Sequence, residues 1–313
     1  MRAPGEETKA AWKVRCGPAG LHIFDRSTGL NILLDEVSVP ASRYSRAPRQ
    51  VSIALTNRCD LACPHCYAPK HRAELRYEIV TRWLAELDAN GTLGVGFGGG
   101  EPTLHPQFAK LCQHAATETQ LSVTFTTHGH HIDEGMADEL RGTVHFIRVS
   151  MDGVGLTYEA IRRRPFGDFL AHMKLVGTIS RFGVNFVVNQ QTLPDLDEAV
   201  AIASSLGSCE LLLLPQMATS GCSQVDVETL LGLRRWVEGY RGDLRLCINE
   251  GSAKDFPTSD PVEAEEGLCA YVHIDAAGFL KPSSYDTTGI PIGADGVLST
   301  LDRLSRDLAE KGI

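Results

Sequence analysis

The sequence predicts an α/β fold: a partial, TIM-like (β/α)6 barrel with a short N-terminal β element and a small α+β C-terminal domain. The two observations that predict it are a series of strand-like apolar runs and the helix-like stretches that separate them. Six short apolar runs, each typical of a buried strand, alternate with helix-like stretches between residues 51 and 215. Strands that alternate with helices become parallel neighbours through right-handed crossovers. Since eight such units close a full barrel, six predict an open one.

The N-terminal part precedes the barrel and is expected to be a separate β element. Residues 11–35 alternate between apolar and polar side chains in three short runs, which Gly and Asp separate. This pattern predicts a small meander or a pair of hairpins. Residues 39–49 contain two prolines and indicate a linker. The first predicted domain is therefore residues 1–49.

The barrel is predicted over residues 50–218. Its clearest helix covers 72–90, where Leu75 and three further large apolar residues recur at four-residue spacing. The other connecting helices are expected at 107–117, 133–140, 166–181 and 196–206. The six strands are expected at 51–55, 94–97, 121–126, 144–150, 184–189 and 211–215.

The remaining chain, residues 219–313, is predicted to form the small α+β domain, because the regular alternation weakens after residue 220. Helices are expected at 227–240 and 298–311, and strands at 244–249 and 272–275.

Composition excludes several classes of protein. The 313 residues carry a formal net charge of −9, which argues against non-specific nucleic-acid binding, since phosphate neutralisation needs clustered Lys and Arg. No apolar run approaches the roughly 18 residues of a membrane span. The start MRAPGEETKAAW has no apolar signal-peptide core. We therefore expect a cytoplasmic protein with no nucleic-acid or membrane partner.

Three of the nine cysteines lie in one short stretch, TNRCDLACPHCYAPK, as Cys59, Cys63 and Cys66. In a reducing compartment, clustered thiols more often hold a metal or do redox chemistry than form disulfides. A compact loop can present three thiolates to one cubane iron–sulfur cluster, which leaves the fourth iron open to another ligand. A structural zinc site needs four ligands, usually as two pairs, and the chain has no second CxxC. His65 as a fourth zinc ligand would strain the same short loop.

The CxxxCxxC motif directly after the first barrel strand, with His65 before the third cysteine, resembles the radical SAM superfamily. The resemblance covers about residues 50–217. It implies that Cys59, Cys63 and Cys66 hold a 4Fe–4S cluster. It also implies that S-adenosylmethionine binds the open iron and is cleaved, after one-electron reduction, to methionine and a 5′-deoxyadenosyl radical.

Further motifs resemble the same family in the same order. GFGGGEP resembles its GGE motif, which implies that Gly99, Gly100 and Glu101 bind the methionine part of the cofactor. A P-loop is excluded because no GK[ST] follows. VSMDG implies that Ser150 contacts the cofactor, with Arg162 in the following segment for its carboxylate, since an Arg fork can bind two oxygens. The resemblance further implies roles for Asn189 at the ribose and Leu214 near the adenine.

The stretch LCAYVHIDAAGFLKPSSYD, residues 268–286, resembles a degenerate SPASM or twitch domain. Pro282-Ser283 stands where a second cysteine is expected, so this region alone cannot supply a four-cysteine auxiliary cluster. Cys222, Cys247 and Cys269 could form a three-thiolate site, or the domain could be a lid without metal; both readings stay open. In THGHHI, His128 stands where the family usually has Asn, and it could line the substrate cavity.

The resemblance implies an oxidoreductase that modifies a ribosomally made peptide, with an electron donor such as flavodoxin or ferredoxin as partner. Two alternatives stay open. One is a small-molecule oxidoreductase or epimerase in natural-product biosynthesis, in which Cys222 would be the catalytic hydrogen-atom donor. The other is a non-catalytic iron–sulfur redox sensor, which the GGE and VSMDG stretches argue against, since a sensor needs no cofactor cradle.

Overall fold

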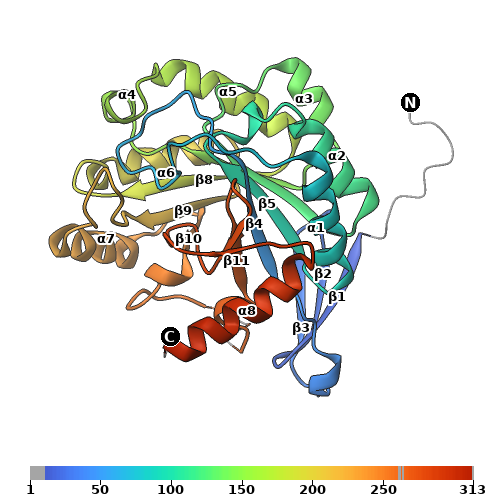
Figure 1. The fold of residues 1–313 in the computed structure, drawn as a ribbon. Helices are drawn as coiled ribbons and strands as arrows, with labels where there is room; N and C mark the ends of the chain where they lie inside the picture. The colour runs from blue at the N-terminus through green and yellow to red at the C-terminus, as the bar shows by residue number, and fades with distance from the viewer. Residues whose placement is uncertain (1–10, 260–261, 263, 312–313) are drawn as a thin grey trace.

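The computed structural model describes residues 11–259, 262 and 264–311, and its centre is a ten-stranded sheet (Figure 1). The strand order is β10-β9-β8-β7-β6-β5-β4-β11-β12-β13. Six neighbouring parallel strands follow chain order: β4 (Gln50–Thr56), β5 (Gly94–Gly99), β6 (Ser122–Thr127), β7 (Phe146–Ser150), β8 (Phe182–Val188) and β9 (Glu210–Pro215). The predicted α/β fold with a run of parallel strands is thereby confirmed.

Helices connect these strands and surround the sheet (Figure 1). They are α1 (Tyr77–Ala89), α2 (Phe108–Glu118), α3 (Glu134–Leu140), α4 (Leu156–Arg162), α5 (Phe166–Ile179) and α6 (Leu196–Ser205). All match predicted helices except α4, a seven-residue helix that was not predicted from the sequence. The helix expected from residue 72 begins only at Tyr77, because the chain before it pairs with the end of β4 through Glu74 and Thr56.

Side-chain alternation along the strands gives the sheet two different faces. In β4, Ile53 and Leu55 are fully buried in the core beneath the helices, whereas Ser52 and Ala54 point to the opposite, inner face. In β5 the inner positions are glycines, among them Gly98. Small and polar residues on the inner face leave space there, and this is the face on which the site is built.

The C-terminal residues extend the barrel sheet at both ends. After α7 (Val227–Gly239), β10 (Arg245–Ile248) pairs in parallel with β9. β11 (Tyr271–Ile274) pairs in parallel with β4, and β12 (Phe279–Lys281) and β13 (Ile290–Pro291) follow as antiparallel strands. An open barrel leaves two unpaired edges, and these segments cover them. One sheet therefore runs across the predicted boundary at residue 218, and a separate domain 219–313 stays a prediction.

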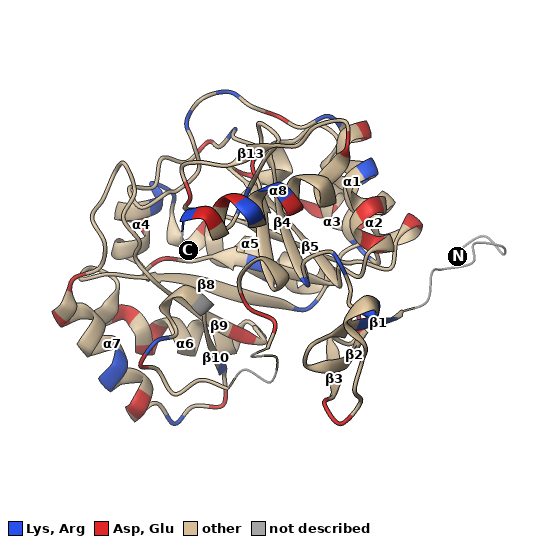
Figure 2. Cartoon of the chain, turned by 60° about the horizontal axis from the view of Figure 1, so that its bottom comes forward, with Lys and Arg blue, Asp and Glu red and all other residues tan. Residues whose placement is uncertain are grey.

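Helix α8 (Gly296–Lys311) lies against α1, and one side chain fixes its start. The Glu86 carboxylate accepts hydrogen bonds from the backbone N–H groups of Val297 and Leu298, each at 2.9 Å. These N–H groups have no partner within the helix, so Glu86 acts as its N-terminal cap. Acidic and basic residues are interspersed along α7 and α8 (Figure 2).

The N-terminal element is a three-stranded antiparallel sheet, as the meander prediction requires: β1 (Trp12–Gly17), β2 (Gly20–Asp25) and β3 (Leu30–Leu34). Two buried cations join it to the rest of the protein. Arg15 pairs with Glu265 at 3.0 Å, and Lys13 pairs with Asp88 at the end of α1. In the part of the chain that the structure describes, no helix has both the length and the apolar character to cross a membrane.

Candidate active site

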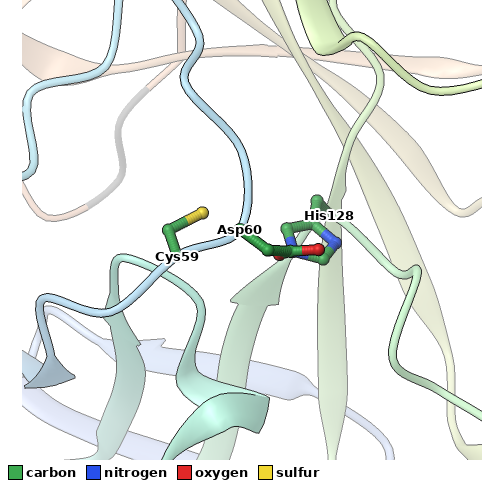
Figure 3. Close-up of side chains that lie close together, drawn as sticks. All are labelled: Cys59, Asp60 and His128. Atoms are coloured by element: carbon green, nitrogen blue, oxygen red, sulfur yellow. The ribbon is translucent and has the colours of Figure 1, made fainter.

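A cavity of about 200 Å³ opens at the carboxyl ends of the parallel strands, where ligands bind in barrels of this kind. Figure 3 shows two of the segments that meet there: the loop after β4, which carries Cys59 and Asp60, and the end of β6, which carries His128. Nine sequence-predicted site residues line this one cavity: Cys59, Cys63, Cys66, Gly99, Gly100, Glu101, Ser150, Arg162 and Leu214.

The three motif cysteines lie in an irregular loop between β4 and α1, and all three are half-buried. The Cys66 N–H donates to the Cys63 carbonyl at 3.2 Å, which tightens the turn between them. Burial raises the pKa of Cys59 to about 11 and also raises the pKa of Cys63. Neutral thiols of this kind are poor nucleophiles, and they ionise when they bind a cation. The loop therefore suits metal ligation better than nucleophilic catalysis.

Gly99 and Gly100 let the loop after β5 pass directly against the cysteine loop. Gly99 has φ +123°, and a Cβ atom there would lie 2.2 Å from the Thr56 carbonyl oxygen. A Cβ atom at Gly100 would lie 2.2 Å from the Arg58 carbonyl oxygen. At Gly99 both the conformation and the close approach require glycine, and at Gly100 the close approach to backbone alone does. The two loops are thereby held together at one side of the cavity.

Glu101 is 1% exposed, and both of its carboxylate oxygens have partners. Oε1 accepts from the hydroxyls of Thr103 at 2.7 Å and Thr127 at 2.8 Å, and Oε2 accepts from the His128 backbone N–H at 3.0 Å. These hydrogen bonds satisfy both oxygens of a carboxylate that is buried away from water. Glu101 therefore joins the end of β5 to the end of β6. It lines the cavity, and the roles of Gly99, Gly100 and Glu101 in binding the cofactor stay predictions.

Asp152 is the centre of a buried polar network that sequence reasoning missed. Its side chain is 1% exposed and its backbone has φ +33°, an uncommon conformation for a non-glycine residue. Oδ2 accepts from Arg162 Nη2 and from His65 Nε2 at 2.9 Å, and Oδ1 accepts from the Val187 N–H at 2.8 Å. Burial alone would raise the pKa of Asp152, but Arg162 and His65 outweigh it and hold the pKa well below its usual range.

Arg162 extends from this network to the cysteine loop. Arg162 Nη1 lies 3.5 Å from Cys63 Sγ, and Arg162 is 8% exposed. Its Nε is buried and has no hydrogen-bond partner in the described part of the chain. A guanidinium has five N–H donors, so this one retains capacity for an anionic group in the cavity.

A second network anchors the other end of the cysteine loop. Asp60 accepts from His128 Nε2 at 3.0 Å, lies 3.2 Å from His131 Nε2, and pairs with Arg164 at 2.6 Å. Ligand atoms of Cys59, Asp60 and His128 lie within 4.8 Å of one another (Figure 3). Burial opposes the charge of Asp60, but hydrogen bonding from His131 and the nearby His128 lower its pKa to about 2. Because Asp60 already has these three partners, the group acts as an anchor for the loop.

Two predicted site residues do not line this cavity. β8 ends at Val188, so Asn189 lies in the following turn, where its side chain bonds to Gln216 and to the backbone of Thr192. The inner-face residue Asn185 lines the cavity in its place. Cys222 contacts Thr219 Oγ1 at 3.3 Å within a local turn. The cofactor role of Asn189 and the catalytic role of Cys222 stay predictions.

An auxiliary three-thiolate site would need Cys222, Cys247 and Cys269 to lie together. In the structure they lie at different positions along the strands of the sheet. Cys222 follows the carboxyl end of β9, whereas Cys269 precedes β11, whose first residue pairs with the first residue of β4. Cys247 lies within β10 and contacts Glu210 at the start of β9. A strand of six residues spans about 20 Å, so the structure does not gather these thiols in one place.

The cavity residues fit an iron–sulfur cluster with a small zwitterionic ligand. Three thiols on one loop face one cavity, which matches the donor set of a cubane with one open iron. Gly99 and Gly100 leave backbone accessible beside them. The buried Arg162 Nε supplies an unused donor for a carboxylate.

Comparison with known proteins identifies a domain family for part of the chain. Residues 53–199 match the radical SAM superfamily domain. The chain is 30% identical over 173 residues to mycofactocin maturase MftC of Mycolicibacterium smegmatis, covering 52% of this chain and 43% of that protein. It is 27% identical over 170 residues to the PqqA peptide cyclase of Granulibacter bethesdensis, covering 51% and 45%. The chain thus spans less than half the length of these curated relatives.

A solved structure shares the fold over most of the chain. Streptococcus suis SuiB bound to precursor peptide SuiA matches with a TM-score of 0.74 and 15% identity, covering 94% of this chain and 88% of that one. Residues 53–199 thus form a domain of the radical SAM superfamily, whose members use a 4Fe–4S cluster and S-adenosylmethionine. The degenerate SPASM-like character of residues 268–286 stays a prediction.

Proposed function

We propose that this protein is a radical SAM enzyme that modifies a ribosomally made peptide. The observation that carries the chemistry is the convergence of Cys59, Cys63 and Cys66 with Gly99–Glu101, Ser150 and Arg162 on one cavity. The relatives support the peptide: one is named a maturase and another a peptide cyclase. Bound together, the cluster and S-adenosylmethionine would supply, on one-electron reduction, methionine and a 5′-deoxyadenosyl radical for hydrogen-atom abstraction from the substrate.

The chain's own residues bind the cluster and S-adenosylmethionine, orient them and shield them from water. The thiolates of Cys59, Cys63 and Cys66 hold the cluster, and the glycine loop lies against the cysteine loop. Arg162 binds the carboxylate of S-adenosylmethionine with the donors that Asp152 leaves free. Ser150, at the end of β7, and Leu214, near the end of β9, contact the nucleoside part.

Two anchors keep this arrangement rigid. Asp152 fixes Arg162 and His65 on one side of the cysteine loop, and Asp60 fixes it to His128 on the other. A site held by buried, mutually bonded groups needs little reorganisation when its ligands arrive. The electron comes from a small redox protein such as flavodoxin or ferredoxin.

Anaerobic reconstitution with iron and sulfide, followed by dithionite and S-adenosylmethionine, tests the proposed chemistry. The wild-type protein should release 5′-deoxyadenosine, measured by liquid chromatography and mass spectrometry. Cys63→Ser should abolish release, and Cys247→Ser, which alters a thiol outside the cavity, should retain it. Release that survives Cys63→Ser, or a wild-type protein that binds iron but releases none, contradicts the proposal.

The peptide substrate is tested separately. A short precursor-like reading frame beside the gene should encode a peptide that, when deuterated on carbon, transfers deuterium into 5′-deoxyadenosine. Deuterium transfer from small metabolites with none from any such peptide would favour the small-molecule alternative.

A further inference from the structure

A second cavity, of about 500 Å³, adjoins the cofactor cavity. Tyr67, Gly99 and Tyr285 line both cavities. The rings of Tyr67 and Tyr285 lie 5.3 Å apart, so they form part of the wall between the two spaces. Its volume lies in the range of sites for small molecules. A radical formed in the first cavity must reach its target across a short distance, and the second cavity begins where the first one ends.

Charged groups line this second cavity. Lys281, on β12, is 9% exposed, and its Nζ lies 2.9 Å from Asp275 Oδ2. The other oxygen of Asp275 accepts from the backbone N–H groups of Ala277 at 2.9 Å and Phe279 at 3.0 Å. Among the described residues, Asp275 is the only hydrogen-bond acceptor that Lys281 contacts. An ammonium has three N–H donors, so Lys281 retains donors for a group inside the cavity.

The loop that covers Lys281 is shaped to approach it closely. A Cβ atom at Gly289 would lie 2.6 Å from Lys281 Cγ and 2.7 Å from the Leu280 carbonyl oxygen. Glycine therefore lets residues 284–289 pass over the aliphatic part of the lysine. Ser284, Asp286, Thr287 and Thr288 of this loop also line the cavity.

The charges in the cavity disfavour an anion. Besides Lys281, the cavity is lined by two carboxylates, Asp275 and Asp286. The His273 imidazole, which bonds Ser52 Oγ at 3.1 Å, is neutral at neutral pH because burial, and then Lys281, lower its pKa to about 4. An entering carboxylate would meet two negative groups, whereas an uncharged acceptor could take the spare donors of Lys281 without this repulsion.

We propose that this second cavity is the substrate subsite, and that it receives an uncharged peptide side chain bearing a hydrogen-bond acceptor, a carboxamide above all. The acceptor bonds to Lys281, and the apolar part packs against Tyr67, Tyr285 and Phe279. This assignment rests on the proposed function in one respect, that the bound side chain is the target of the radical. The cavity and the position of Lys281 do not depend on the proposed function.

The test compares two probes of equal shape, N-acetyl-glutamine N-methylamide and N-acetyl-glutamate N-methylamide. Binding to the reconstituted holoenzyme with S-adenosylmethionine is measured by saturation-transfer NMR titration at neutral pH. We expect the glutamine probe to bind at least about tenfold more tightly than the glutamate probe. A hydrogen bond from a charged donor contributes about 1.5 kcal/mol, which is about tenfold in Kd. Lys281→Met should therefore raise the Kd of the glutamine probe by that factor.

A blocking variant keeps the test independent of Lys281. Thr288 is exposed on the covering loop, and Thr288→Trp should fill the cavity and abolish binding of the glutamine probe. Thr117→Trp, at an exposed position on α2, is the matched control and should bind normally. Equal affinity for both probes, no saturable binding of either, or normal binding by Thr288→Trp would each overturn the assignment.

Release of 5′-deoxyadenosine from the same samples separates the two proposals. If the protein cleaves S-adenosylmethionine but binds neither probe, the subsite assignment fails and the proposed chemistry stands. If it binds the glutamine probe selectively but releases no 5′-deoxyadenosine, the proposed chemistry fails and the subsite stands as a ligand site.

Discussion

Replacing Asp152 by Asn tests the buried network that holds the cofactor site. The substitution keeps the volume and the acceptor for the Val187 N–H, but it removes the negative charge facing Arg162 and His65. Arg162, which is 8% exposed, is then left without its ion-pair partner. Removing one partner of a buried ion pair lowers the free energy of unfolding by about 3 kcal/mol or more, because the remaining charge is uncompensated.

That free energy converts into a measurable shift in Tm. With an unfolding entropy of about 2.1 cal/mol/K per residue, a loss of about 3 kcal/mol lowers the Tm of a chain of this length by about 5 °C. Circular dichroism of anaerobic, reconstituted protein would show it. Glu134→Gln, at an exposed pair 3.8 Å from Arg141, is the control and should shift the Tm little. Equal shifts for the two variants would refute the reasoning.

Two further predictions concern a glycine and a histidine. Gly99→Ala should destabilise the protein more than Gly207→Ala in thermal unfolding, because both have positive φ but only Gly99 lies against backbone; equal losses would show that the close approach is unimportant. Burial lowers the pKa of His145 to about 4, so the folded state binds fewer protons than the unfolded state below pH 6.5, and stability falls as pH drops from 6.5 towards 4. His145→Gln keeps an acceptor for the Val123 N–H and should remove roughly 2 kcal/mol of that pH dependence in denaturant titrations at pH 7.5 and 4.5; an unchanged slope would count against it.

Much of the fold follows from local sequence. Short runs rich in apolar residues and glycine indicate the barrel strands, and helix-like stretches between them indicate the connecting helices other than α4. The cavity residues could be predicted from the sequence because their motifs directly follow strands, and parallel strands bring their carboxyl ends together. Cys59, Glu101 and Ser150 converge for this reason.

The parts that were missed depend on contacts distant in sequence. Asp152 stands in a Met-Asp-Gly turn and has no local mark of burial; its role comes from Arg162, His65 and β8. β11 pairs with β4 from more than 200 residues away, so the sequence indicates a strand there but not its neighbour. The same holds for Tyr285, which reaches the cofactor cavity only because β11 and β12 extend the sheet beside β4.

Electron paramagnetic resonance of the reconstituted, reduced protein tests the central claim most directly. The account predicts the signal of a reduced 4Fe–4S cluster whose g values shift when S-adenosylmethionine is added, because Cys59, Cys63 and Cys66 leave one iron open to it. A cluster signal that the metabolite leaves unchanged, or a protein that takes up zinc in place of iron, would contradict it.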